Sequence, residues 1–324
     1  MTMPLEPASR DFLAQLAEAG GPAVDHWTPA IARMSDLILA GLSGPGPAVG
    51  SVRSLELDGK GGKFRVRVLK PEGEPKAVLV YFHGGGWVVG DIDLQYDHVG
   101  RRLANLTGST VVMVNYRKAP EHPFPIAIED SYVALNWAAE HTAELASEGV
   151  PLIVAGDSAG GNISAVMTLW ARDKAGPKID YQVLVYPVTD CDVNTASYLA
   201  PENQLLLDRD AMIWFWDHYL GHEKVRKHPD ASPLRAESHA GLPPALVYVA
   251  EYDPLHDEGV AYAKALEAAG VTVTFAVAEG QMHAYFQMAK LLPGYDDGMQ
   301  LVAGHINSFV AAFDKEPDPC ATTT

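Results

Sequence analysis

The residues best suited to do chemistry lie in the segment LIVAGDSAGGNISAVMTLW, at 152–170. Its apolar first part predicts a buried strand, and its last part has a helical pattern. Between them, Gly156, Ser158 and Gly160 form G-x-S-x-G, which in a strand–turn–helix context raises a serine oxygen above a sheet. The dipole of the following helix favours negative charge that develops near this serine. Ser158 is therefore the candidate nucleophile.

A serine hydroxyl becomes a good nucleophile only beside a base, which in turn needs an orienting group. With this type of turn, the chain order is serine, then aspartate or glutamate, then histidine. Asp253 directly follows a predicted strand at 245–250, and His283 follows another at 271–277 after a short loop. Because ligands gather at the carboxyl ends of parallel strands, we expect Asp253, His283 and Ser158 to meet there.

Other acidic residues and histidines fit these roles less well. Asp257 and Glu258 fall at the start of the next predicted helix, where an acidic side chain usually compensates the helix dipole. His305 lies in an apolar stripe of the terminal helix, which is typical of a packed core histidine. His256 lies beside Asp253 in its own loop, where it could line the site.

The segment VYFHGGGWVVGD, at 80–91, places three glycines after another predicted strand. Attack on a carbonyl creates an oxyanion, and preorganised N–H donors stabilise it. We expect donors from Gly84 and Gly85 and from Ala159, the residue after the nucleophile, while His83 and Gly86 shape the turn. The spacing matches neither a phosphate-binding P-loop nor a dinucleotide-binding turn, and the chain holds no cluster of metal ligands at the usual spacing.

Of eight predicted strands, the six from about residue 77 onward alternate with helical patterns, which indicates an α/β protein with a mostly parallel sheet covered on both faces. An early pair of strands around DGKGGK predicts an antiparallel hairpin at the sheet edge. The alternation stops between 188 and 244, where an aromatic helix indicates part of a cap, joined by two N-terminal helices. The predicted strands are 52–57, 64–69, 77–82, 110–115, 152–155, 182–187, 245–250 and 271–277, and the helices after the hairpin are 95–107, 126–145, 159–174, 258–269 and 296–313.

The composition excludes several classes of partner. A net charge of −17 opposes binding to nucleic acid or to an anionic membrane, so a neutral or apolar substrate fits better. No apolar run is long enough to span a membrane. The only cysteines, Cys191 and Cys320, are far apart, and the N-terminus has no secretory pattern, so we expect a cytoplasmic protein.

With these motifs in place, the chain resembles the hormone-sensitive-lipase-like esterases (bacterial family IV) of the α/β-hydrolase superfamily, in their GDSAG branch. The matching motifs are HGGGW (83–87), NYRKAPEHPFPIAIED (115–130), GDSAGGN (156–162), DPLHDEG (253–259) and MHAYF (282–286).

The resemblance implies an α/β-hydrolase fold with a helical cap and hydrolysis of short- to medium-chain acyl esters without a cofactor. It implies catalytic Ser158, Asp253 and His283, and oxyanion donors Gly84, Gly85 and Ala159. The expected division is a cap at 1–48 and 191–240 and a catalytic core at 49–190 and 241–324. The chain departs from the family at Lys118, where an apolar residue is usual, and at Ala284, where glycine is usual.

Substrate contacts and partners are the least defined expectations. Candidates for the substrate pocket are Trp87, Asp157, Trp214, Phe215 and Tyr285, with Trp216 and Phe286 beside them, although core packing explains each aromatic residue equally well. An amidase, a lactonase or a thioesterase would use the same machinery, and a non-catalytic receptor would lack His283. The edge strand near 271–277 could pair two copies in a homodimer. Because a free imidazole titrates near ~6.5, activity should fall at acid pH.

Overall fold

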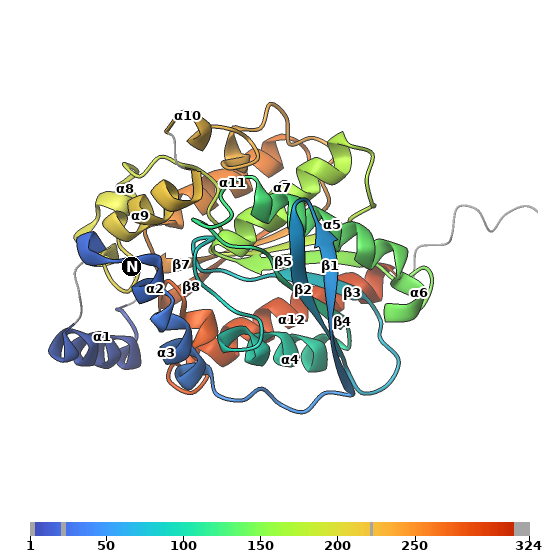
Figure 1. Cartoon of the computed structure of the whole chain (residues 1–324), viewed down its shortest axis with the longest axis horizontal. Coiled ribbons are helices and arrows are strands. Elements are labelled where there is room, and N and C mark those ends of the chain that lie inside the picture. The colour runs from blue at the N-terminus through green and yellow to red at the C-terminus, as the bar shows by residue number, and fades with distance from the viewer. Residues whose placement is uncertain (1–3, 21–23, 221–222, 314–324) are drawn as a thin grey trace, which may run out of the picture.

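The computed structural model describes residues 4–20, 24–220 and 223–313. Its strands form one sheet in the order β1-β2-β4-β3-β5-β6-β7-β8 (Figure 1). The pairs β1·β2 and β2·β4 are antiparallel, and every other pair is parallel. The strands are Ser51–Gly59 (β1), Gly62–Lys70 (β2), Val78–Phe82 (β3), Thr110–Asn115 (β4), Leu152–Asp157 (β5), Tyr181–Val185 (β6), Ala245–Tyr252 (β7) and Val273–Met282 (β8).

Burial of the strands explains their place in the sheet. The central strands β3, β5 and β6 are apolar along most of their length, and every residue in them is buried. Strand β1 is largely exposed and lies at one edge, where it forms the expected hairpin with β2. Continuous apolar runs therefore form the strands that helices cover on both faces.

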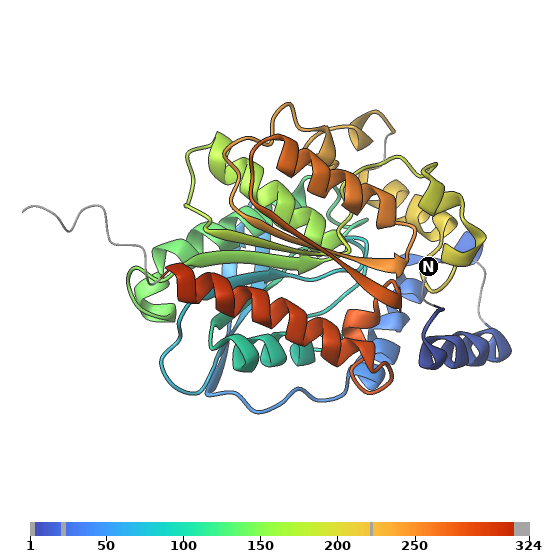
Figure 2. The same cartoon turned by 180° about the vertical axis from the view of Figure 1, so that it is seen from behind.

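Helices cover both faces of the sheet (Figure 2). The helices α5, α7 and α11 lie on one face, and α4 and α12 lie on the other. The long helices of these two layers are Gln95–Thr107 (α4), Ile126–Glu140 (α5), Ala159–Asp173 (α7), His256–Ala268 (α11) and Gly294–Phe313 (α12). Short elements beside them are Thr142–Leu145 (α6), Glu223–Arg226 (α10), Pro233–Arg235 (η3) and Tyr285–Gln287 (η4).

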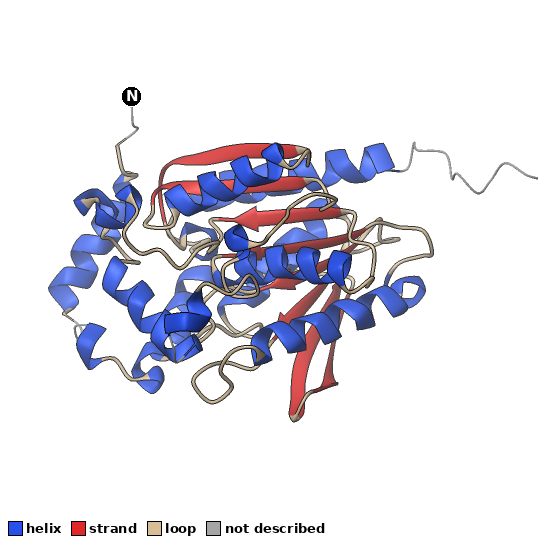
Figure 3. Ribbon diagram, turned by 90° about the horizontal axis from the view of Figure 1, so that it is seen from above, coloured by secondary structure: helices blue, strands red, loops and turns tan. Residues whose placement is uncertain are grey.

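A group of helices that we call the cap helices lies together beyond the carboxyl ends of the parallel strands (Figure 3). Trp27 and Trp214 connect its N-terminal and insertion parts, since their rings meet edge to face at 5.9 Å and Trp214 Nε1 donates to the Trp27 carbonyl. The cap helices are Pro7–Ala19 (α1), Pro29–Ala32 (α2), Met34–Ser43 (α3), Ala196–Leu199 (α8) and Arg209–Leu220 (α9), with the turns Val24–His26 (η1) and Pro201–Asn203 (η2).

The fold follows the expectation with two local differences. The helix expected at 126–145 is divided at His141 into α5 and α6. Strand β8 continues to Met282, so His283 follows the strand directly rather than after a short loop. The register of β7 and β8 is irregular between Ala250 and Tyr252, but Met282 still pairs with Tyr252. This last pairing extends β8 up to the site. Cys320 lies outside the described residues.

Candidate active site

The turn at 156–160, which we call the serine turn, holds Ser158 between β5 and α7. Ser158 has φ 55° and ψ −120°, a conformation that L residues rarely adopt and that places the side chain above the sheet. A Cβ at Gly160 would overlap the carbonyl oxygen of Phe82 in the neighbouring strand. A glycine at this position is therefore required for the helix to approach β3 this closely.

Three predicted residues form one hydrogen-bonded chain at the carboxyl edge of the sheet. His283 Nε2 lies 3.0 Å from Ser158 Oγ, and His283 Nδ1 lies 2.6 Å from Asp253 Oδ2. Asp253 Oδ1 also accepts the N–H of Leu255 at 2.9 Å, which fixes the plane of the carboxylate. Asp253 is fully buried, and Ser158 and His283 are 6% and 7% exposed. The imidazole can thus take a proton from the serine while a buried carboxylate holds its tautomer.

The other acidic residues of the DPLHDEG segment serve the loops around the site. Asp257 Oδ2 accepts the N–H of Ser197 at 2.8 Å. Glu258 Oε1 accepts the N–H of Thr189 at 2.7 Å, and burial holds the pKa of Glu258 well above its usual range. Neither carboxyl group is hydrogen-bonded to His283, so the geometry favours Asp253 as the acid.

Asp157 does not line a substrate pocket, contrary to the expectation. It is fully buried, and its oxygens accept hydrogen bonds from the hydroxyls of Tyr81 (2.8 Å) and Tyr96 (2.9 Å) and from Gln287 Nε2 (3.1 Å). Burial raises the pKa of Asp157, although the hydrogen bonds from Tyr81 and Tyr96 act in the opposite direction. The fourth donor to this carboxylate is the N–H of Gly84, at 3.1 Å.

The segment 83–90, which we call the glycine loop, therefore differs from the expectation at its first glycine. The N–H of Gly84 is directed to Asp157 and is not free to bind an oxyanion. Among the described residues, no hydrogen bond uses the N–H of Gly85 or Gly86. A Cβ at Gly86 would overlap the ring of Phe215, so this part of the loop lies directly beneath a side chain of α9.

His83 has a structural place beneath the glycine loop. Its ring stacks on Tyr116 at 4.3 Å, and its Nδ1 lies 2.6 Å from the carbonyl oxygen of Gly84. Burial lowers the pKa of His83 well below its usual value, so the ring is neutral at physiological pH. This agrees with the expectation that His83 shapes the turn.

The structure separates the aromatic candidates into two groups. Trp87 is fully buried and stacks on Tyr219 at 4.2 Å, and Tyr285 is fully buried against Tyr186. Both were candidates for the substrate pocket, but their side chains pack in the core. Trp216 and Phe286 are likewise fully buried. Phe215 and Trp214 are half-buried, and of the two it is Phe215 that contacts the glycine loop.

Several residues around the site were not found from the sequence. Tyr81, Tyr96 and Gln287 all bind Asp157, although they come from β3, α4 and η4. A tyrosine inside the otherwise fully apolar run of β3 is a visible signal, because a buried hydroxyl needs a partner. Tyr186 lies 4.5 Å from the His283 ring, and no feature of the sequence singled it out.

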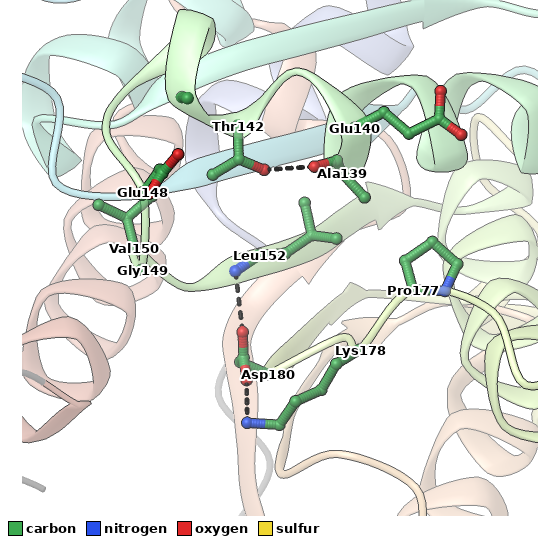
Figure 4. A pocket seen from close by; sticks show the side chains of 11 residues that line it. Ala139, Glu140, Thr142, Glu148, Gly149, Val150, Leu152, Pro177, Lys178 and Asp180 are labelled. Carbon is green, nitrogen blue, oxygen red and sulfur yellow. Dashed lines mark hydrogen bonds and ion pairs between the residues drawn. The ribbon is translucent and has the colours of Figure 1, made fainter. Parts of the chain in front are cut away.

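The hollow shown in Figure 4 lies away from these residues. It has a volume of about 390 Å³ and is lined by residues such as Leu152, Lys178 and Asp180. Leu152 begins β5, whereas Ser158 follows its last residue, so the hollow is at the amino end of the strand. Within residues 4–20, 24–220 and 223–313, no group of three or more His, Cys, Asp or Glu side chains could hold a metal ion.

Comparisons with known proteins show the family to which this chain belongs. Residues 79–287 match the family model described as alpha/beta hydrolase fold. The carboxylesterase NlhH of Mycobacterium tuberculosis is 43% identical over 219 residues, which cover 67% of this chain and 68% of that protein. The ethyl acetate hydrolase of Pseudomonas putida is 37% identical over 238 residues, covering 72% and 74%. The crystal structure of a thermostable esterase from Pseudomonas putida superposes with a TM-score of 0.89 at 36% identity, covering 95% of this chain and 98% of that one.

The chain therefore belongs to the alpha/beta hydrolase fold family. The resemblance to the hormone-sensitive-lipase-like esterases is confirmed, as is the expected α/β-hydrolase fold with a mostly parallel eight-stranded sheet. Among the helices of the described residues, none has the length and apolar character needed to cross a membrane.

Proposed function

We propose that this protein hydrolyses carboxylic esters through an acyl-enzyme intermediate formed on Ser158. The observation that carries the proposal is the hydrogen-bonded chain from Asp253 through His283 to Ser158. The family and the esterases among the relatives support it. The protein is a serine carboxylic-ester hydrolase.

The reaction proceeds in two halves. Ser158 Oγ attacks the ester carbonyl while His283 Nε2 takes the serine proton, and a tetrahedral oxyanion forms. When the carbon–oxygen bond to the alcohol breaks, His283 returns this proton to the leaving alkoxide. A water molecule then attacks the acyl group, with His283 again as base, and releases the carboxylic acid and free Ser158. Asp253 stabilises the imidazolium in both halves.

The oxyanion is bound by the N–H groups of Gly85, Gly86 and Ala159. Ala159 is the first residue of α7, so its N–H lies at the positive end of the helix dipole. Gly84 is left out because Asp157 accepts its N–H. Each such donor accounts for roughly a 10²- to 10³-fold increase in kcat in serine hydrolases.

The acyl group lies between the glycine loop and the cap helices. Phe215 of α9 contacts Gly86, next to the place where the substrate carbonyl binds. An apolar wall this close favours short- to medium-chain acyl groups. We propose Phe215 as a substrate contact and Trp214 as the residue that holds α9 against η1, through Trp27.

The test is a panel of aryl esters of increasing acyl length, assayed with the wild type, Ser158→Ala and Ser164→Ala. Ser164 is the matched control, because it lies in the same helix and its hydroxyl donates to the Gly160 carbonyl at 2.8 Å. We expect Ser158→Ala to lower kcat on the order of 10⁴- to 10⁶-fold and Ser164→Ala to stay active. A Ser158→Ala variant that keeps most of the activity would exclude the mechanism.

We also propose a division of the chain into two parts, a contact between two copies and a location in the cell. The chain divides into a cap of residues 1–48 and 191–240 and a catalytic core of 49–190 and 241–324.

Two copies pair through the edge strand β8, which has β7 as its partner in the sheet and exposes 41% of Phe275. A monomer by light scattering at assay concentration would contradict the pairing. Two distant cysteines favour the cytoplasm, which cell fractionation tests.

A further inference from the structure

Two side chains of the cap helices contact the glycine loop from outside the catalytic core. Arg33, between α2 and α3, donates from Nε to the carbonyl oxygen of Val88 at 3.0 Å. Asp36, in the first turn of α3, accepts the N–H of Gly90 on Oδ1 at 2.9 Å. The two contacts fall on either side of Val89, so together they fix the position and the orientation of this part of the loop.

Both side chains are themselves held in place. The Arg33 guanidinium also donates to the Ala119 carbonyl at 3.0 Å and to both oxygens of Glu121, at 2.8 and 2.6 Å. These hydrogen bonds lower the pKa of Glu121 to about 2. Asp36 is 8% exposed and also accepts a hydrogen bond from Gln95 Nε2 at 2.9 Å. A planar guanidinium with this many partners has little freedom to move.

A displacement at Val88–Gly90 must reach the N–H groups that face the substrate. Gly85 O accepts the N–H of both Val88 (3.0 Å) and Val89 (2.9 Å), which closes the loop into a tight turn. Gly90 packs so closely that a Cβ there would lie 2.6 Å from the carbonyl oxygen of Gly84. Apart from the two cap contacts, the far side of this turn is held by the N–H of Ala119 on the Trp87 carbonyl, at 2.9 Å.

We propose that Arg33 and Asp36 are positioning residues for the oxyanion donors of the glycine loop, so that the N-terminal cap helices control the rate of the chemical step. The inference rests on the proposed function and adds to it the cap residues that hold the donors. Because an oxyanion exists only in the transition state and the intermediate, a misplaced donor lowers kcat while substrate binding changes little.

The experiment compares Arg33→Lys, Asp36→Ala and Asp36→Asn with the wild type. Lysine keeps a cation beside Glu121 but cannot reproduce the fork that contacts Val88, and asparagine keeps an acceptor for the Gly90 N–H. The matched controls are Met34→Ala and Leu37→Ala, on the exposed face of α3, where these side chains are 63% and 67% exposed. For each variant, kcat, KM and the affinity for a trifluoromethyl ketone with the same acyl group are measured, together with urea unfolding.

We expect Arg33→Lys and Asp36→Ala to lower kcat on the order of 10- to 100-fold, the effect of a small misplacement of a catalytic group. KM should stay within about twofold, and the affinity for the ketone should fall in parallel with kcat, since the ketone adduct carries the oxyanion. Asp36→Asn and both controls should stay within about threefold of the wild type, as surface changes do.

Two results would overturn the inference. One is that folded Arg33→Lys and Asp36→Ala have the same kcat and the same ketone affinity as an active wild type. The other is a rise in KM at unchanged kcat, which would assign the two residues to substrate binding. If the wild type itself hydrolyses no ester of the panel, the proposed function fails instead, so the two failures are distinguishable. Should Asp36→Ala not fold, Arg33→Lys alone decides, because it retains the ion pair with Glu121.

Discussion

The serine turn and the glycine loop follow neighbouring strands, β5 and β3, but different forces hold them in place. The serine turn is fixed by close backbone contacts: Gly160 against Phe82, the Ser158 N–H on Val185 O at 2.9 Å, and the Val188 N–H on Ser158 O at 3.1 Å. The glycine loop is held largely by charged side chains outside it. The nucleophile is thus placed by packing and backbone hydrogen bonds, whereas the glycine loop and its N–H donors are placed by hydrogen bonds with side chains outside the loop.

This difference assigns the two halves of the site to different parts of the chain. The contacts of the serine turn come from the sheet and from α7, so the nucleophile needs only the core. The glycine loop is contacted by Asp157 from the core and by Arg33 and Asp36 from the cap helices. Changes in packing should therefore affect the serine turn through stability, and changes in the hydrogen-bonding side chains around the glycine loop should act through rate or pH dependence.

The largest effect is expected from Gly160→Ala. The added Cβ would overlap backbone atoms of Phe82 and His83, which cannot rotate away, so β3 and α7 must separate. We expect the free energy of unfolding to fall by about 3 kcal/mol, the upper end of the range for overpacked cores, as measured by urea denaturation.

The matched control for Gly160→Ala is Gly304→Ala in α12. Nothing lies within 4 Å of a Cβ at Gly304, and alanine is the better helix former, so this variant should gain up to about 1 kcal/mol. If Gly160→Ala unfolds at the same urea concentration as the wild type, packing does not fix the serine turn.

Asp157→Asn should have a smaller effect, and on the rate instead of the stability. The carboxylate has two acceptor oxygens for four donors, whereas an asparagine has only one acceptor oxygen. In the variant the Gly84 N–H therefore competes with Tyr81, Tyr96 and Gln287. We expect kcat to fall about tenfold because the glycine loop loosens at its first residue. Asp173→Asn, in an exposed part of α7, is the control, and equal kcat values for the two variants would contradict the role of Asp157.

The smallest effect is a change in the pH dependence of stability at Lys118, beneath the glycine loop. Burial lowers the pKa of Lys118 to about 8, and its Nζ donates to Asn115 Oδ1 at 2.6 Å. Between about pH 8 and 10.5 the unfolded chain binds more protons at this lysine than the folded chain, so folding becomes more favourable as pH rises. The wild type should therefore gain stability over Lys118→Met across this interval.

The control for Lys118 is Lys60→Met, since the Lys60 side chain is 78% exposed. Urea unfolding at several pH values between 7 and about 10.5 gives the difference between each variant and the wild type. A difference for Lys118→Met that is independent of pH would show that the charge of Lys118 is not suppressed by folding.

The same contrast explains which parts could be predicted from the sequence. The serine turn is local: Gly156, Ser158 and Gly160 lie within five residues, and the apolar strand and helix around them are visible in the pattern. Asp253 and His283 were found because each follows a strand whose carboxyl end must reach the same edge. A short turn motif and the positions of two strand ends were therefore sufficient to predict these residues.

The glycine loop could be predicted only in outline. Which N–H faces the substrate depends on the turn itself, where Gly85 and Gly86 have φ of 113° and 55°, and the sequence does not give these angles. Trp87 and Asp157 are next to residues of the site in the chain, but neighbouring side chains of a turn or strand point in different directions, and both are buried. Arg33 and Asp36 reach the loop across more than fifty residues of sequence, and no local pattern predicts such contacts.

Covalent labelling with a fluorophosphonate tests most directly whether Ser158 is the nucleophile. The reagent is added in increasing amounts, and residual ester hydrolysis and the mass of each peptide are followed together. We predict one phosphonyl group per chain on the peptide that contains Ser158, with activity lost in the same proportion, and no labelling of Ser158→Ala. Complete inactivation with the Ser158 peptide unmodified would contradict the mechanism.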